Sequence, residues 1–226
     1  MPQSGGTEIK MTKISPSVLA CDLSNLASEV KEIELAGADM VHLDVMDGMF
    51  VTNMSFGMPI IESLRKKSEM IFDVHLMIAK PERYAMRFID AGADILTFHV
   101  EACEDSAALL DEIRKRGVKS AISVKPKTPI ESIYPLLPKC DMVLVMTVEP
   151  GYGGQALIPE CLDKVRVLRD EIERRGLSVD IQVDGGINSS NAKDAISAGA
   201  NVLVAGSAVF GAKDKAKAIN DIKNAK

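Results

Sequence analysis

The chain has 226 residues, of which 46% are hydrophobic and 26% are charged, and its formal net charge is −5. This apolar content is sufficient for a folded core and excludes a disordered or low-complexity chain. The acidic charge, the aromatic content of 4% and the lack of tryptophan argue against a nucleic-acid partner. No segment approaches the roughly 18 consecutive apolar residues of a membrane-spanning helix, so we expect no membrane partner.

The N-terminus lacks the apolar segment of a secretory signal. We therefore expect residues 1–10 to be a flexible extension and residues 11–226 to form one domain. The four cysteines are widely spaced and form no CxxC pair: Cys21, Cys103, Cys140 and Cys161. This spacing argues against a disulfide framework or a thiolate zinc site, and it favours a cytoplasmic location.

Short apolar runs alternate with longer amphipathic segments along the chain. Eight of these runs predict β-strands: Ile14–Ala20, Met40–Val45, Ile71–Met77, Ile95–Val100, Ser120–Val124, Met142–Thr147, Val179–Val183 and Val202–Ala205. The segments between them have the spacing of amphipathic helices, and a final helix is expected near Ala208–Asn224. Two examples are the apolar stripes Leu26, Val30, Ile33, Leu35 and Leu162, Val165, Leu168, Ile172.

Strict alternation of strands and helices predicts an α/β fold with a parallel sheet and right-handed crossovers. An Ala-Gly-Ala-Asp or Ala-Gly-Ala-Asn motif closes a helix and opens a strand at residues 36–39, 91–94 and 198–201. Eight units of one strand followed by one helix predict a closed (β/α)₈ TIM barrel, with its active site at the carboxyl ends of the strands. An open, doubly wound sheet is the alternative, but no GxGxxG motif follows the first predicted strand.

Polar residues at the ends of three predicted strands are candidates for chemistry. Alternation puts His42 and Asp44 on one face of the second strand, and Asp73 and His75 on one face of the third. Asp184 ends the seventh strand. Buried imidazoles and carboxylates need compensation, which a divalent ion provides, so we expect one Zn²⁺, Fe²⁺, Mn²⁺ or Co²⁺ ion at a site formed by His42, Asp44, His75 and Asp184. The alternative is a set of hydrogen-bonded His–Asp pairs without a metal.

Glycine-rich turns follow the last three predicted strands. They are Gly151-Tyr152-Gly153-Gly154 after the sixth, Gly185-Gly186 after the seventh and Gly206-Ser207 after the eighth. Glycine lets backbone N–H groups approach an anion closely, and phosphate sites on such barrels use the loops after strands seven and eight. These turns therefore indicate a phosphate site. The alternative is that tight connections between strands and helices need glycine in any case.

Five segments, taken in order, resemble the ribulose-phosphate 3-epimerase family over about Ile14 to Phe210. They are Ser15–Leu19, His42–Gly48, Asp73–Met77, Val145–Gln155 and Val183–Ile187. The resemblance implies a metal-dependent epimerase of the pentose phosphate pathway. Its substrates would be the ketopentose phosphates D-ribulose 5-phosphate and D-xylulose 5-phosphate, which such an enzyme interconverts.

The resemblance also implies roles for individual residues. The ligands of one divalent metal ion would be His42, Asp44, His75 and Asp184, and Asp44 and Asp184 would also move the proton at carbon 3. Ser17 and His75 would contact the sugar. The phosphate end would be bound by Gly151, Tyr152, Gly153, Gly154, Gly185, Gly186, Gly206 and Ser207. A methionine cluster beside the enediolate would consist of Met46, Met77 and Met146, for which core packing is the alternative.

The segment after the second strand departs from the family pattern. The family usually has Asp-Gly-His-Phe-Val-Pro-Asn where this chain has Asp-Gly-Met-Phe-Val-Thr-Asn at residues 47–53. Thr52 in place of proline frees the backbone, Met49 removes a polar group, and Tyr152 replaces a phenylalanine. We expect these changes to affect closure over the substrate and fine specificity, not the chemistry.

Several alternatives are open on the sequence alone. A 3-epimerase of allulose 6-phosphate shares the motifs, and a non-catalytic barrel could bind a sugar phosphate. A decarboxylase or aldol-type synthase needs a lysine at a strand end, for which Lys125 is the candidate. His99 and Glu101 share one face of the fourth strand, and for His99 we favour packing or support of a ligand over metal binding. We also expect a homo-oligomer.

Overall fold

The computed structural model describes residues 11–225, so the predicted extension of residues 1–10 lies outside the described residues. Within residues 11–225, eight parallel strands pair in the order β1-β8-β7-β6-β5-β4-β3-β2. Their bounds are β1 Lys13–Pro16, β2 Met40–Met46, β3 Ile71–Met77, β4 Ile95–His99, β5 Lys119–Val124, β6 Met142–Met146, β7 Asp180–Asp184 and β8 Val202–Ala205. A parallel bridge between Ser17 and His42 joins the two ends of this order into a nearly closed ring. The predicted (β/α)₈ barrel is confirmed.

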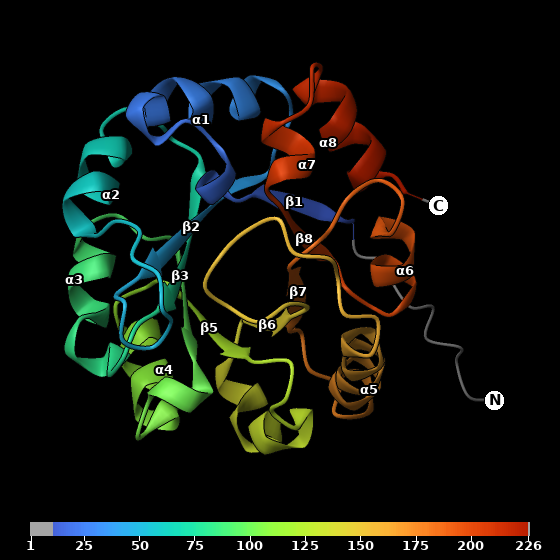
Figure 1. Ribbon diagram of the computed structural model, residues 1–226. Coiled ribbons are helices and arrows are strands. Elements are labelled where there is room, and N and C mark those ends of the chain that lie inside the picture. The colour runs from blue at the N-terminus through green and yellow to red at the C-terminus, as the bar shows by residue number, and fades with distance from the viewer. Residues whose placement is uncertain (1–10, 226) are drawn as a thin grey trace.

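Helices surround the ring of strands, as Figure 1 shows in a view along the barrel. Their bounds are α1 Leu26–Leu35, α2 Met58–Arg65, α3 Ala85–Asp90, α4 Ser106–Lys115, α5 Cys161–Arg174, α6 Ala192–Ser197, α7 Ser207–Phe210 and α8 Lys215–Lys223. The apolar stripe of α5 is buried, because every third or fourth side chain faces the sheet. Among residues 11–225, no helix combines the length and the apolar content needed to cross a bilayer.

Besides one-residue shifts at the ends of several strands, the structure differs from the predicted elements at three places. The first strand ends at Pro16, because Ser17 caps the short 3₁₀ turn Val18–Ala20 with its hydroxyl. Between β5 and β6 the connection is a 3₁₀ segment, η5 (Ile130–Lys139), which contains two prolines that an α-helix interior disfavours. The final helical segment is divided into α7 and α8.

One residue of the apolar stripe predicted for α1, Leu35, is exposed and does not face the core. Val30 and Ile33 are fully buried, whereas Leu35 is 77% exposed. Leu35 follows Ile33 by two residues, and on a helix this spacing places the two side chains on opposite faces. The buried stripe of α1 therefore does not include Leu35.

The inside of the barrel changes in character from one end to the other. At the amino ends of the strands, a small apolar cluster is formed by Met40, Ile95, Ala121, Met142 and Val202. Toward the carboxyl ends, the inward side chains become polar and stay buried: Ser15, His42, Asp44, Asp73, His75, Thr97, His99, Ser123 and Gln182. This polar end is where the fold places the candidate site.

Candidate active site

Strands β2 and β3 deliver four ionisable side chains to one end of the barrel. The two strands pair in parallel from Met40 opposite Ile71 to Met46 opposite Met77. This register sets His42 beside Asp73, and Asp44 beside His75. His42, Asp73 and His75 are fully buried, and Asp44 is 2% exposed. The predicted alternation is confirmed, since these polar residues occupy the inner face.

Asp184, at the end of β7, completes a compact cluster with His42, Asp44 and His75. One ligand atom from each residue lies within 4.8 Å of the others. Asp44 Oδ1 is 3.1 Å from His42 Nε2 and 3.0 Å from His75 Nδ1. Asp184 Oδ2 is 3.8 Å from His42 Nε2 and 3.9 Å from His75 Nδ1. The structure thus brings together all four residues that the sequence predicts as metal ligands.

The donor atoms of this cluster fit a divalent cation. His42 Nε2 is buried and has no hydrogen-bond partner among residues 11–225, although it faces two carboxylates. The opposite nitrogen, Nδ1, lies 2.7 Å from Asp73 Oδ2, so a proton on Nδ1 leaves a lone pair on Nε2. A buried lone pair without a partner is costly, and a cation bound between the four side chains would remove that cost.

The surroundings move the pKa values of the two aspartates in opposite directions. Burial raises the pKa of Asp184 to about 6, and the negative charge of Asp44 adds to the effect. For Asp44, burial acts in the same sense, but His42 and His75 outweigh it and hold its pKa well below the usual range. Two carboxyl groups with opposed pKa shifts can serve as an acid and a base in one site.

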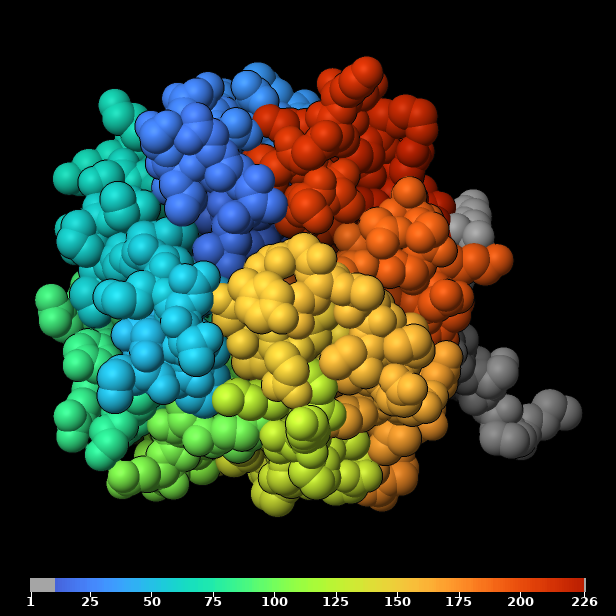
Figure 2. All heavy atoms as spheres, in the orientation of Figure 1, coloured from blue at the N-terminus to red at the C-terminus, as the bar shows by residue number. Residues whose placement is uncertain are grey.

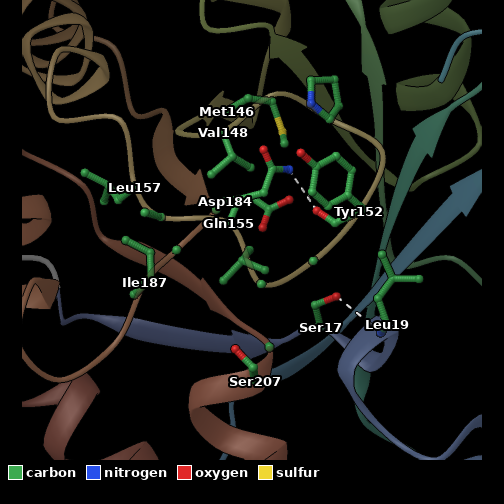
Figure 3. A pocket seen from close by; sticks show the side chains of 18 of the residues that line it. Ser17, Leu19, Met146, Val148, Tyr152, Gln155, Leu157, Asp184, Ile187 and Ser207 are labelled. Carbon is green, nitrogen blue, oxygen red and sulfur yellow. Dashed lines mark hydrogen bonds between the residues drawn. The ribbon is translucent and has the colours of Figure 1, made fainter. Parts of the chain in front are cut away.

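A cavity of about 1050 Å³ opens above the cluster at the carboxyl ends of the strands (Figure 3). Asp44 and Asp184 line it, whereas His42 and His75 lie buried beneath. Ser17 also lines it and donates a hydrogen bond of 2.6 Å to Asp44 Oδ2. The other predicted site residues that line the cavity are Met46, Met77, Met146, Gly151, Tyr152, Gly153, Gly154, Gly185, Gly186, Gly206 and Ser207.

The segment after β6 lies across the middle of this face, as its yellow atoms show in Figure 2. Within this segment, Gln155 Nε2 donates hydrogen bonds to the carbonyl oxygens of Glu149 and Tyr152, which stabilise its conformation. Gly186, after β7, has a φ of +71°, and a Cβ there would lie 2.3 Å from the backbone nitrogen of Leu157. Glycine is therefore required where the two segments pack, which gives Gly186 a structural reason besides any contact with an anion.

Of the residues that depart from the family pattern, Tyr152 lines the cavity, whereas Met49 and Thr52 do not. Met49 is 81% exposed and Tyr152 is 63% exposed, and neither belongs to the His–Asp cluster. Val51 is buried, and a Cβ on Gly151 would lie 3.3 Å from Val51 Cβ. The segments after β2 and β6 therefore touch one another beside the cavity.

Lys125 does not line the cavity, although it follows β5 at the same end of the barrel. Its ammonium group lies 3.8 Å from the centroid of the Phe50 ring, in a cation–π contact. This position gives no support to the lysine-dependent alternatives.

Two residues next to the cluster have contacts that the sequence pattern did not assign. Asp73 accepts hydrogen bonds from Ser15 Oγ and Gln182 Nε2 and faces His42 Nδ1. His99 lies outside the group of candidate ligands, with its Nε2 atom 3.0 Å from His75 Nε2. Alternation put Asp73 on one face with His75, and His99 on one face with Glu101. The partners of Asp73 and His99, however, depend on the register of neighbouring strands.

Buried ionisable residues beneath a cavity at the carboxyl ends of eight parallel strands define a (β/α)₈ barrel enzyme. Residues 13–210 match the model of the ribulose-phosphate 3 epimerase family, and the chain belongs to that family of isomerases. The chain is 45% identical over 215 residues to ribulose-phosphate 3-epimerase from Synechocystis, with 94% of each chain covered. It is 43% identical to the cytoplasmic isoform from Oryza sativa, with 93% of this chain and 92% of that protein covered.

Solved structures with lower sequence identity share the fold. A 3-keto-L-gulonate-6-phosphate decarboxylase from Vibrio cholerae superimposes with a TM-score of 0.70 at 16% identity, covering 95% of this chain and 96% of that chain. A 3-hexulose-6-phosphate synthase gives a TM-score of 0.68 at 18% identity, covering 94% and 99%. At such identities the similarity concerns the barrel and not its chemistry.

Proposed function

We propose that the chain is a metal-dependent epimerase that interconverts D-ribulose 5-phosphate and D-xylulose 5-phosphate. One observation supports this most strongly: two aspartates from distant strands, Asp44 on β2 and Asp184 on β7, line one cavity and have opposed pKa shifts. The relatives named ribulose-phosphate 3-epimerase, which match over nearly the whole chain, identify the substrate class.

Epimerisation at carbon 3 removes a proton next to the carbon 2 ketone and returns a proton to the opposite face. The electron pair of the broken C–H bond moves into an enediolate and returns to carbon 3 when the new C–H bond forms. A single group cannot reach both faces of this planar intermediate without a large movement. Asp44 and Asp184 therefore have complementary roles. One acts as a carboxylate that accepts the proton, and the other acts as a carboxyl group that donates a proton to the opposite face.

The proposed ligands of one divalent ion, Zn²⁺, Fe²⁺, Mn²⁺ or Co²⁺, are His42, Asp44, His75 and Asp184. When bound, such an ion supplies positive charge that stabilises the oxyanion formed as the proton leaves. Ser17, which is hydrogen-bonded to Asp44, faces the cavity and orients both the carboxylate and the sugar.

Three buried methionines from three strands, Met46, Met77 and Met146, line the cavity near the aspartates. They exclude water and offer no protons to the intermediate. The phosphate end of the substrate binds at the glycine-lined side, formed by Gly151, Tyr152, Gly153, Gly154, Gly185, Gly186, Gly206 and Ser207. Binding energy gained there holds carbon 3 between the two carboxyl groups.

The direct test is epimerisation of D-ribulose 5-phosphate before and after treatment with a chelator, followed by addition of each divalent ion. We expect activity to be lost on chelation and restored by at least one ion. Full activity in chelated protein that contains no metal would contradict the metal requirement. Failure to exchange the carbon 3 proton of the substrate with D₂O would favour a non-catalytic binding protein.

The same assay with D-allulose 6-phosphate separates the pentose from the hexose substrate. We expect a higher kcat/KM for the pentulose, and the reverse order would assign the hexulose activity instead.

We also propose that the protein acts in the cytoplasm as a homo-oligomer. Sedimentation analysis tests the oligomeric state, since a monomer at micromolar concentration would contradict it.

A further inference from the structure

His75 is connected to a partly exposed carboxylate, Glu101, that does not belong to the metal cluster. Its Nε2 atom lies 3.0 Å from His99 Nε2, and His99 Nδ1 lies 3.2 Å from Glu101 Oε2. Both imidazoles are fully buried, and the Glu101 side chain is 22% exposed. Three side chains thus form a continuous hydrogen-bonded line that runs from the cluster to the edge of the barrel.

Glu101 is fixed as an acceptor at the outer end of this line. Its Oε1 atom receives hydrogen bonds from the backbone N–H of Lys125, at 2.8 Å, and from the Thr128 hydroxyl. Burial opposes a charge on Glu101, but the hydrogen bonds from His99, Lys125 and Thr128 outweigh it and lower its pKa to about 2. A carboxylate has no proton to donate, so the hydrogen bond to His99 has one possible direction.

The positions of the protons along the line follow from that direction. His99 Nδ1 must carry a proton in order to donate to Glu101, so in the neutral ring His99 Nε2 is an acceptor. His75 Nε2 must then carry the proton that His99 Nε2 accepts. In neutral His75 this leaves the lone pair on Nδ1, the atom that faces Asp44 and Asp184.

We propose that Glu101 and His99 are positioning residues that fix the tautomer of His75 and so present its Nδ1 lone pair to a divalent cation. This inference rests on the metal site of the proposed function. His42 is held directly by Asp73, whereas His75 is held by a carboxylate acting through a second imidazole. The Phe50 ring packs on His99 at 4.7 Å between centroids and covers the line on one side.

The sharpest test is Glu101→Gln, which preserves the shape of the side chain and reverses the donor and acceptor roles along the hydrogen-bonded line. The Gln amide oxygen is needed by the donors from Lys125 and Thr128, so the NH₂ group turns toward His99 Nδ1. His99 then donates from Nε2, and the His75 proton moves to Nδ1, where it blocks the cation. We expect the Kd for Zn²⁺, measured by competition with a chromophoric chelator, to rise by about 10- to 100-fold.

Glu104→Gln is the matched control. It removes the same charge, lies three residues further along the chain than Glu101, and has a side chain that is 85% exposed. It should leave the Zn²⁺ affinity within about 2-fold of the parent.

¹⁵N NMR of the histidine rings supplies a readout that a merely structural role would not change. In the Zn²⁺-loaded parent, we expect protons on His75 Nε2 and on His99 Nδ1.

His99→Phe removes the acceptor by another route, and Thr97→Val, an inward-facing residue on the same strand, controls for substitution inside the barrel. We expect the first to weaken Zn²⁺ binding by at least 10-fold, and the second to leave it unchanged. Parent-like affinity in both Glu101→Gln and His99→Phe, or a proton on His99 Nε2 in the parent, would overturn the proposal. A parent protein that binds no Zn²⁺ would instead overturn the metal site of the proposed function.

Discussion

The two ends of the barrel interior are built from the same strands and have opposite properties. The amino end combines the apolar cluster of Met40, Ile95, Ala121, Met142 and Val202 with a cavity of about 260 Å³. The carboxyl end contains buried histidines and aspartates beneath a cavity of about 1050 Å³. Apolar burial stabilises the fold, whereas buried charges must be compensated by partners. Substitutions at the two ends should therefore affect different measurements.

The largest effect is expected at the carboxyl end. Asp44→Asn and Asp184→Asn should each lower kcat by at least about 10²-fold, because each removes a group that moves a proton in the reaction. Steady-state kinetics with D-ribulose 5-phosphate measures the change. Near-normal turnover in either variant would refute the scheme with two carboxyl groups.

Because both aspartates are also proposed metal ligands, the metal content of each variant must be measured with its kcat. A variant saturated with metal but still impaired shows that the proton-transferring group itself is missing. Thr97→Val is the control, since Thr97 is buried on the inner face and lies outside the candidate cluster. Its kcat should stay within about 2-fold of the parent.

At the amino end, a substitution should change stability and leave turnover unaltered. Ile95 is 4% exposed in the apolar cluster, so Ile95→Ala should lower the free energy of unfolding by about 2–4 kcal/mol. Ile71, at the start of the neighbouring strand, is 41% exposed, and Ile71→Ala should cost about 1 kcal/mol or less. Urea denaturation gives both values. A fall in kcat of the folded Ile95→Ala protein would show that the two ends are coupled.

The same contrast explains how much could be predicted from the sequence. Strands β3 and β8 were predicted with their observed bounds. Val202–Ala205 is a continuous apolar run, and in Ile71–Met77 only Asp73 and His75 interrupt the apolar residues, a pattern typical of buried parallel strands. The alternation within β2 correctly placed His42 and Asp44 inside the barrel. Local periodicity is therefore sufficient to assign the fold and the inner faces.

What local periodicity does not give is the pairing between distant side chains. Asp73 was expected to face inward, but its contact with His42 depends on the register of β2 against β3. The line from His75 through His99 to Glu101 likewise needs β3 and β4 in their observed register. Register is set by tertiary packing, so these supporting contacts could be recognised only in the structure.

A smaller effect than the loss of a catalytic aspartate is expected from pH, which changes the stability of the carboxyl end in metal-free protein. The pKa of Asp184 is about 6 in the folded state and 3.8 as an ordinary aspartate. A raised pKa stabilises the folded state at low pH, and this contribution is lost as pH rises through about 6. Between pH 4 and 7 the loss should amount to no more than about 3 kcal/mol, because each pKa unit corresponds to about 1.4 kcal/mol.

Comparison of the parent with Asp184→Asn isolates this contribution, because His99, whose pKa is lowered to about 4, titrates in the same range with the opposite sign. As pH rises from 4 to 7, the parent should lose stability relative to Asp184→Asn. Ile71→Ala, which removes no ionisable group, should differ from the parent by a constant amount over the same range. A constant difference for Asp184→Asn as well would mean that Asp184 is charged throughout, and the acid and base could then not be assigned from the environments of the two aspartates.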